Sequence, residues 1–299
     1  MDGSDASTRR DGLSADVLAA VLTQVMIAAG TYLAAKRAMQ EATPLSLVSL
    51  RVIGAGAVFA LVFALMPSRR VPTGKAIGTS ALLGLIAGPL NQGLFFYGLA
   101  SSTAAHGALL YALTPIGVYL WDVAAGLERF KPRQLGGIAL AFAGVALLLL
   151  GRGLAGAFGP LKGDAFILGG VIAWVAYTRI SRTFSREVGA LRASGWSMAF
   201  GGLWMLPLFP FLYRPGELAA ASHVAQGAFV FLVLMSSVAA YLLWSYALER
   251  ASAAKVAVFS NLQPVATALA GWALLGEPIG WEVIAGGVLV MAGVRLAQR

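Results

Sequence analysis

The sequence predicts an all-α integral membrane protein whose ten transmembrane helices form two inverted five-helix repeats. Hydrophobic residues make up 59% of the 299 residues and charged residues only 12%, whereas a soluble domain has about a quarter charged residues. The mean hydropathy is +0.78. Ten apolar runs are long enough to cross a bilayer core about 30 Å thick, and the second half of the sequence repeats the first.

The predicted spans follow one another with short connections. They cover Ala15–Lys36, Thr43–Met66, Ala76–Leu99, Thr103–Leu127, Arg133–Gly151, Leu161–Phe184, Ala190–Tyr213, Ala225–Leu248, Ser252–Leu275 and Ile279–Leu296. The runs are continuously apolar rather than alternating, which excludes a transmembrane barrel. The chain then divides into a polar N-terminal tail over residues 1–14, a first repeat over 15–151 and a second repeat over 161–299.

The charge distribution predicts the orientation. The net charge of +9 comes from 22 Lys and Arg against 13 Asp and Glu, and the basic residues lie in short clusters between apolar runs. We therefore exclude nucleic acid as a partner and expect a lipid bilayer instead. With the N-terminus inside, sixteen basic residues fall on the cytoplasmic side and six, among them Arg51, on the opposite side. The positive-inside rule then places both termini in the cytoplasm.

An internal repeat appears when the sequence is compared with itself at an offset of 149 residues. The matched pairs include Tyr97 with Tyr246, Pro115 with Pro264, Glu128 with Glu277, Gly137 with Gly286 and Gly144 with Gly293. Each half holds five spans, an odd number, so consecutive halves insert into the membrane in opposite orientations. Inverted repeats are typical of transporters that bind substrate near the membrane midplane and work by alternating access.

Two tandem five-span units with a Pro-centred fourth span and a Gly-rich fifth span resemble the EamA units of the drug/metabolite transporter superfamily. The resembling residues are Tyr97–Pro115 followed by Glu128 and Gly137–Gly144, and Tyr246–Pro264 followed by Glu277 and Gly286–Gly293. Within the superfamily the chain is most similar to bacterial aromatic amino-acid exporters of the YddG type. The resemblance implies export of neutral, especially aromatic and hydrophobic, amino acids and related metabolites across a bacterial inner membrane.

Pro115 and Pro264 lie near the centres of their spans. Proline removes a backbone donor and leaves the carbonyl four residues earlier without its helical partner. Such carbonyls are tolerated where they face a cavity or a bonding neighbour. We therefore predict a pair of hinges beside the substrate, and a packing kink without ligand contact is the alternative.

Polar side chains surround the prolines and continue into the third span. They are Asn91 and Gln92 in the third span, Tyr111 and Thr114 beside Pro115, and Ser260, Asn261 and Gln263 beside Pro264. Amides donate and accept hydrogen bonds at once, which suits a neutral or zwitterionic substrate. Hydrogen bonds between helices are the alternative role for each of them.

Aromatic residues indicate a second layer of the site. Trp174 and Tyr177 lie in the sixth span with Tyr32 as the repeat partner of Tyr177, and Tyr97 and Tyr246 lie in the third and eighth spans with Tyr241 and Trp244. An aromatic lining would stack on an aromatic side chain. The alternative is the interfacial belt of membrane proteins. We expect the third, fourth, eighth and ninth spans to line the cavity, with contributions from the first and sixth.

Few charged residues are placed to couple transport to ions. His106 and Lys255 occupy equivalent positions near opposite mouths, and Asp122 is the one carboxylate well within a span. No carboxylate lies at the midplane, which favours facilitated transport, although His106 or Asp122 can carry a proton. A proton-coupled efflux transporter of drugs or other metabolites is the alternative.

The sequence indicates no enzyme and no cofactor. Two histidines and no cysteine are too few for an embedded catalytic or metal site, and no nucleotide-binding motif occurs. Glycines in the fifth and tenth spans indicate close helix packing, within a monomer or in a weak homodimer.

Overall fold

The computed structural model describes residues 13–66, 72, 74–99, 110–151, 161–275 and 280–297. The first half contains α1 (Ala15–Ala38), α2 (Pro44–Leu65), α3 (Lys75–Leu85), η1 (Ile86–Gln92), α4 (Gly93–Leu99), α6 (Thr114–Ala124) and α7 (Pro132–Gly151). The second half contains α8 (Leu161–Val188), α9 (Ala190–Met205), α10 (Phe209–Leu212), α11 (Glu217–Ala220), α12 (His223–Phe231), η2 (Leu232–Ala239), α13 (Ala240–Arg250), α14 (Ala253–Ala257), η3 (Val258–Asn261), α15 (Leu262–Leu275) and α16 (Trp281–Ala297). No strand occurs within these ranges, so the all-α prediction is confirmed.

Four helices are long and apolar enough to cross a membrane. They are Ala15–Ala35, Pro44–Leu65, Lys162–Val188 and His223–Arg250. Helices also occupy the other predicted spans wherever the structure describes them, but they are shorter, interrupted or less apolar. The count of ten transmembrane helices therefore stays a prediction. Most of the N-terminal tail and the start of the fourth predicted span lie outside the described residues.

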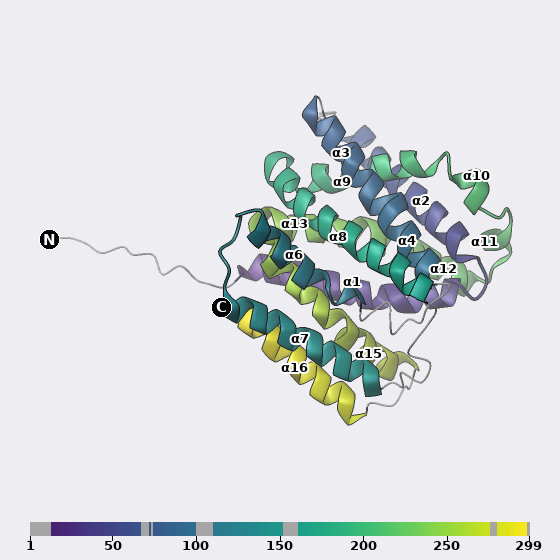
Figure 1. Cartoon of the computed structure of the whole chain (residues 1–299). Coiled ribbons are helices and arrows are strands. Elements are labelled where there is room, and N and C mark those ends of the chain that lie inside the picture. Colours follow the sequence, from purple (N-terminus) through teal and green to yellow (C-terminus); the bar gives the residue numbers. More distant parts are fainter. Residues whose placement is uncertain are drawn as a thin grey trace.

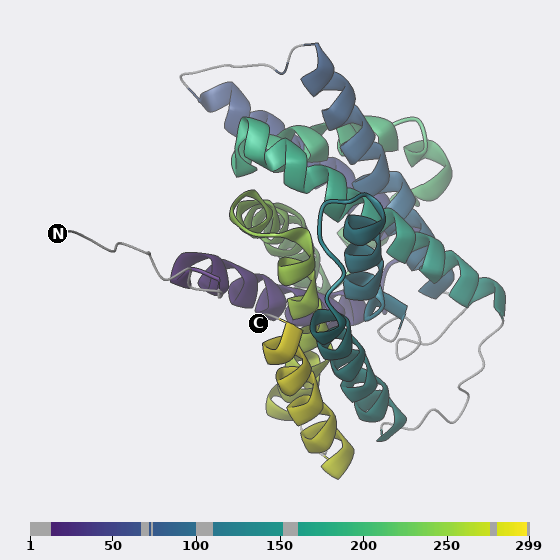
Figure 2. The same ribbon diagram turned by 60° about the vertical axis from the view of Figure 1, so that its left-hand side comes forward.

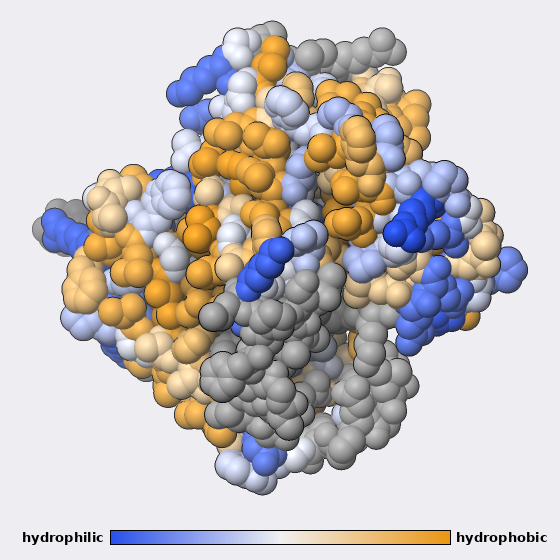
Figure 3. All heavy atoms as spheres, turned by 45° about the vertical axis from the view of Figure 1, so that its right-hand side comes forward, coloured by the Kyte–Doolittle hydropathy of each residue, from blue (hydrophilic) through white to orange (hydrophobic). Residues whose placement is uncertain are grey.

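Large apolar side chains cover much of the outer surface. Leu65, Phe211 and Trp281 are among the most exposed of them. Figure 3 shows broad hydrophobic areas on one face, with hydrophilic side chains gathered mainly toward its edges. Such a surface is unfavourable in water and favourable against lipid chains.

Two of the long helices contain π-helical turns, one in each half of the chain. η1 joins α3 to α4 without a break, and η2 joins α12 to α13. Pro89 within η1 lacks a backbone N–H and so interrupts the regular α-helical pattern. In η2 the Ser237 hydroxyl donates to the Leu232 carbonyl at 3.0 Å. Both turns lie in the helices that carry the polar residues of the site, as π turns frequently do.

The helices α7 and α16 pack backbone against backbone (Figure 1). A Cβ atom added at Gly137 would lie 2.8 Å from the Gly293 carbonyl oxygen, and one added at Gly144 would lie 2.6 Å from the Gly286 carbonyl oxygen. A later residue of one helix meets an earlier residue of the other, so the two helices run antiparallel. The offset of 149 residues matches Gly137 with Gly286 and Gly144 with Gly293, so exchanging the two halves turns one glycine contact into the other. The contact is therefore symmetric between the two halves.

A second close contact lies between α9 and the helices α2 and α3. A Cβ atom at Gly56 would lie 2.9 Å from the Met198 carbonyl oxygen, and one at Gly84 would lie 2.6 Å from the Ser197 carbonyl oxygen. In Figures 1 and 2, α1 crosses between this group of helices and the α7–α16 pair. Helices from the two halves thus interleave, and the main core includes residues at both contacts, among them Met198 and Ile138.

The connection between α1 and α2 is tied to the segment before α12. The Glu217 carboxylate accepts hydrogen bonds from the backbone N–H and the hydroxyl of Thr43, each at 2.9 Å. Glu41 accepts from the backbone N–H of Ser222 at 2.6 Å and from its hydroxyl at 2.9 Å, and it pairs with Arg37 at 2.5 Å. These bonds join the two halves of the chain at one end of the bundle.

The glycine contact of α7 predicts a position-specific loss of stability. Gly137→Ala places a methyl group against the α16 backbone, and overpacking of this kind costs about 1–3 kcal/mol. Gly136 has open space at its Cβ position, so Gly136→Ala is the matched control. Both variants gain the same stabilisation from helix propensity, about 1 kcal/mol. The difference between their stabilities therefore measures the contact of position 137 with α16. We expect a lower melting temperature for detergent-purified Gly137→Ala than for Gly136→Ala, and equal values would contradict this packing.

The loop contact predicts a pH dependence. Hydrogen bonds from Ser222, and then the Arg37 charge, hold the pKa of Glu41 below its ordinary value of 4.5. A carboxylate with a depressed pKa stabilises the folded state above its unfolded pKa, and this contribution is lost as the pH falls through the folded value. The difference in melting temperature between wild type and Glu41→Gln should therefore shrink from about pH 7 to about pH 4. A difference that stays constant over this range would show that the Glu41 charge makes no contribution.

Candidate functional site

Four aromatic side chains meet between α8 and α13. We call Trp174, Tyr177, Tyr241 and Trp244 the aromatic cluster. The Trp174 ring stacks on Tyr177 with centroids 5.2 Å apart, and it meets Tyr241 at 5.5 Å and Trp244 at 5.6 Å. Trp174 is half-buried and the other three are buried. The rings pack on one another between the two helices, so the structure brings Trp174 and Tyr177 together with two aromatic residues of the eighth predicted span.

An amide pair connects the cluster to η1. Asn91 Nδ2 donates to the Tyr111 hydroxyl and to the Gly170 carbonyl, both at 2.8 Å. Gln92 Nε2 donates to Asn91 Oδ1 at 2.9 Å and to the Tyr241 hydroxyl at 3.4 Å. Gln92 and Tyr241 are separated by 149 residues, the offset of the repeat. Equivalent positions of the two halves therefore touch, which places this contact where the repeats meet.

Arg51 lies buried beside this network, and the sequence analysis did not place it there. Its side chain, on α2, donates from Nε to the Ser237 hydroxyl at 2.6 Å and from Nη2 to the Ser236 hydroxyl at 2.8 Å. Only 6% of the residue is exposed. Counting basic residues by side assigned Arg51 to an outer segment. The signal that could have found it is its position inside the apolar run Thr43–Met66.

Both proline helices are interrupted just before the proline. Pro115 is in the first turn of α6, which begins after a turn at residues 112–113. Pro264 follows the 3-10 turn η3, so the ninth predicted span is divided into α14, η3 and α15. The proline positions thus lie close to the start of a helical segment in each half, and their role as hinges stays a prediction. α6 packs against α14 and η3, which brings the two proline segments together.

The polar residues beside the prolines differ in burial. Thr114 and Asn261 are buried, and neither the Thr114 hydroxyl nor the Asn261 amide has a hydrogen-bond partner among the described residues. Ser260 and Gln263 are half-buried. Buried polar groups without partners are energetically costly.

Tyr97 and Tyr246 lie apart from the aromatic cluster. Tyr97 is exposed at the end of α4, where its ring meets Phe166 at 4.8 Å. The Tyr246 hydroxyl donates to Asp16 at 2.7 Å, and the Arg250 guanidinium lies 3.7 Å from its ring centroid.

The remaining predicted residues are placed only in part. Lys255 lies on the short helix α14. Tyr32 lies on α1, and its side chain is outside the described part of the structure. His106 lies outside the described residues.

Asp122 forms a buried ion pair. Its carboxylate on α6 lies 2.5 Å from Nε of Arg179 on α8, and the carboxylate is fully buried. The charge of Arg182 acts on the same carboxylate. The sequence analysis predicted a possible proton role for Asp122 but did not identify this partner.

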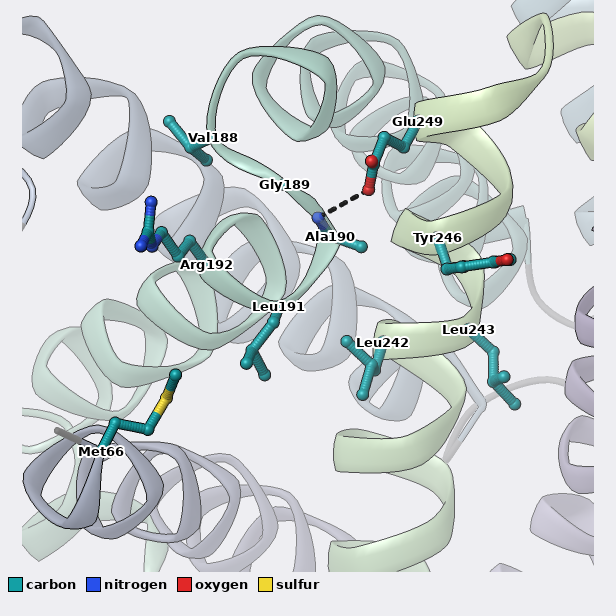
Figure 4. A pocket seen from close by; sticks show the side chains of 10 residues that line it. All are labelled: Met66, Val188, Gly189, Ala190, Leu191, Arg192, Leu242, Leu243, Tyr246 and Glu249. Atoms are coloured by element: carbon teal, nitrogen blue, oxygen red, sulfur yellow. Dashed lines mark hydrogen bonds between the residues drawn. The ribbon is translucent and has the colours of Figure 1, made fainter. Parts of the chain in front are cut away.

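A pocket of about 480 Å³ lies where α8 turns into α9. Figure 4 shows its lining by Leu191, Leu242 and Leu243, with Met66 at the end of α2. Glu249 at its edge accepts a hydrogen bond from the Ala190 N–H at 2.9 Å. Tyr246 is the one predicted site residue on its wall, so this pocket is separate from the aromatic cluster.

The comparison with protein families decides what these repeats are. The model described as "EamA-like transporter family" matches residues 16–150 and again residues 161–298. The chain belongs to this family. It is a membrane transporter with two EamA repeats, and the resemblance read from the sequence is confirmed.

Curated relatives of this EamA transporter are between 21% and 30% identical to it over the aligned residues. An uncharacterized transporter, YyaM, of Bacillus subtilis is 30% identical over 73% of this chain and 72% of its own length. A probable amino-acid metabolite efflux pump of Salmonella typhimurium is 28% identical over 56% of this chain and 58% of its own length. A probable terminal-alkyne amino-acid exporter of Streptantibioticus cattleyicolor is 28% identical over 77% of this chain and 76% of its own length.

A solved crystal structure has the same fold. It superposes with a TM-score of 0.79, covers 95% of this chain and 97% of its own, and is 19% identical. Among the residues that the structure of this chain describes, no three His, Asp or Glu side chains lie together as metal ligands would.

The Asp122–Arg179 pair predicts a large effect of removing one charge. Asp122→Asn leaves Arg179 buried without its counter-charge, and breaking a buried pair costs about 3–5 kcal/mol. The double variant Asp122→Asn/Arg179→Gln should recover part of this loss. Arg37→Gln, at a partly exposed pair, is the control, with an expected cost of about 0–1 kcal/mol. Thermal unfolding in detergent measures all three variants, and an Asp122→Asn value equal to the control value would argue against the buried pair.

Proposed function

We propose that this EamA transporter exports neutral, especially aromatic and hydrophobic, amino acids and related metabolites by facilitated alternating access. The observation that carries the proposal is the aromatic cluster joined through Gln92 to the amide pair, at a contact between equivalent positions of the two repeats. Flat rings suit an aromatic side chain, and amides suit a zwitterionic backbone. Two relatives bear names that describe amino-acid or amino-acid metabolite export.

The proposal includes ten transmembrane helices in two inverted five-helix repeats over 15–151 and 161–299. Antiparallel packing of α7 against α16 through equivalent glycines supports the inversion. The excess of basic residues on one side supports cytoplasmic termini in a bacterial inner membrane. Pro115 and Pro264 are the proposed hinges, because both interrupt their helices where α6 meets α14 and η3.

The proposal also includes the absence of tight ion coupling and of any enzymatic activity. The buried carboxylate Asp122 is held by Arg179, so a proton relay through it requires the pair to open. The family and the named relatives are transporters. We place the substrate against the aromatic cluster, the amide pair and the residues beside the prolines, with Tyr32, Tyr97, Tyr246, His106 and Lys255 as outer contacts.

Uptake into proteoliposomes tests the function. Radiolabelled phenylalanine, methionine and a lipophilic cation are compared with and without an imposed pH gradient. We expect amino-acid flux that follows its own gradient and does not respond to the pH gradient. Cation flux driven by pH without amino-acid flux would instead establish the proton-coupled drug transporter.

Trp174→Ala tests the site. Removing the ring that contacts three other aromatic side chains should reduce the apparent affinity for phenylalanine about tenfold, and Trp174→Phe should retain most of it. Trp281→Ala removes an exposed tryptophan at the start of α16 and is the matched control. Unchanged uptake in a well-folded Trp174→Ala variant would remove the aromatic cluster from the site.

A further inference from the structure

Arg51 is a buried cation without a carboxylate beside it. Among the described residues its hydrogen bonds go to two hydroxyl groups, and no ion pair includes it. The other buried arginine of the core, Arg179, is paired with Asp122. A charge inside a membrane helix is expensive and normally faces a cavity, a partner or a substrate path. The described part of the chain therefore supplies no counter-charge for Arg51, and its burial requires another explanation.

The two serines fix the orientation of the guanidinium group. Ser237 and Ser236 accept from Nε and Nη2, which are the two donors on the side of the group away from Cδ. Ser237 in turn donates to the Leu232 carbonyl, so the π turn η2 determines where this hydroxyl lies. The Nη1–H and the second Nη2–H form the end-on pair of the guanidinium, and they have no acceptor among the described residues. This pair matches the two oxygens of a carboxylate.

The neighbours of Arg51 belong to the site described above. The phenols of Tyr111 and Tyr241 are its electrostatic neighbours. Tyr111 accepts from Asn91, and Tyr241 accepts from Gln92 and packs edge-on against Trp174. A positive charge thus lies near the two phenols that bond the amide pair, and one of them, Tyr241, also belongs to the aromatic cluster.

We infer that Arg51 binds the carboxylate of the transported molecule through Nη1 and Nη2. The inference rests on the proposed function and narrows its substrate class to compounds that carry a carboxylate next to an apolar or aromatic group. The substrate supplies the counter-charge that the described residues do not provide. A lipophilic cation would be repelled at the same position, which separates amino acids from the cationic drugs of the alternative function.

A purely structural role is the competing explanation. In that case Arg51 only ties α2 to η2 through the serines, and its charge is incidental. The two explanations differ in what they require. A structural role requires the hydrogen bonds to both serines, whereas carboxylate binding requires the positive charge and the end-on donors on Nη1 and Nη2.

Three probes that share a phenyl ring on a two-carbon chain separate these roles. They are phenylalanine, 3-phenylpropionate (a carboxylate without an ammonium group) and phenethylamine (an ammonium group without a carboxylate). Competition with labelled phenylalanine uptake is measured in proteoliposomes, and the thermal shift caused by each probe is measured in detergent. The full-length chain is compared with Arg51→Gln, Arg51→Lys, Ser236→Ala/Ser237→Ala and the exposed control Arg133→Gln.

We expect 3-phenylpropionate to compete at a concentration about tenfold lower than phenethylamine in the wild type and in Arg133→Gln. Arg51→Gln should lose this preference together with most phenylalanine uptake. Arg51→Lys should keep a reduced preference, because an ammonium group does not offer the two parallel N–H donors of a guanidinium group. The serine double variant should keep the preference, because the charge remains.

Equal competition by the two probes in the wild type would overturn the inference, as would an unchanged preference in Arg51→Gln. Loss of the preference in the serine variant to the same extent as in Arg51→Gln would assign Arg51 a structural role. Failure of the proposed function is visible separately, as a wild type without phenylalanine uptake. A thermal shift by 3-phenylpropionate in that wild type, absent in Arg51→Gln, would still support the carboxylate site, and no shift in either would overturn it.

Discussion

Close backbone contact between the two repeats is the constraint on which the rest of this structure depends. Helices in a membrane gain little from hydrophobic association, because lipid chains are as apolar as their side chains. Packing at short distance replaces that driving force, and only glycine permits it here. Gly137, Gly144, Gly286 and Gly293 bring α7 and α16 together, and Gly56 and Gly84 do the same for α2 and α3 against α9. Arg51 on α2 and the amide pair on η1, which continues α3, belong to the helices that the second contact holds against α9.

The polar groups in that space find their partners mostly in the opposite repeat. Arg51 of the first repeat donates to Ser236 and Ser237 of the second, and Gln92 donates to Tyr241. Asn91 donates to the Gly170 carbonyl across the same boundary. Hydrogen bonds inside a membrane cannot be exchanged for bonds to water, so each of them has to be replaced when the repeats move. Motion of one repeat against the other is therefore coupled to these few side chains, which is the property that alternating access requires.

The sequence predicts the repeat and its helices well, because both depend on local features. Apolar runs have the length of helices, proline interrupts helices at its own position, and glycine at an offset of 149 residues marks the contact of α7 with α16. The pairing of side chains depends on how each helix is rotated, which periodicity does not fix. Tyr97 and Tyr246 have the same sequence signal as Tyr241, yet only Tyr241 joins the aromatic cluster.

The charged residues also show that the sequence alone does not predict which side chains pair. Counting Lys and Arg by side treats every basic residue as part of a loop, so it places Arg51 and Arg179 at the surface. Burial of Arg51 on α2 and the pairing of Arg179 with Asp122 follow only from the assembled bundle. An isolated arginine in the middle of an apolar run is the one local sign, since such a residue is costly in lipid.

The packing of the aromatic cluster bears on how a substrate binds. Its rings already contact one another between α8 and α13, so an aromatic side chain that enters exchanges ring contacts within the protein for similar contacts with the substrate. Such an exchange returns only part of the free energy of the new ring contacts, so the polar end of the substrate also contributes to the affinity. A ligand shifts an equilibrium between two conformations only by its difference in affinity for them. In the proposed mechanism, aromatic contacts combined with one fixed charge at Arg51 would suit a transporter that releases its cargo on either side without an ion gradient.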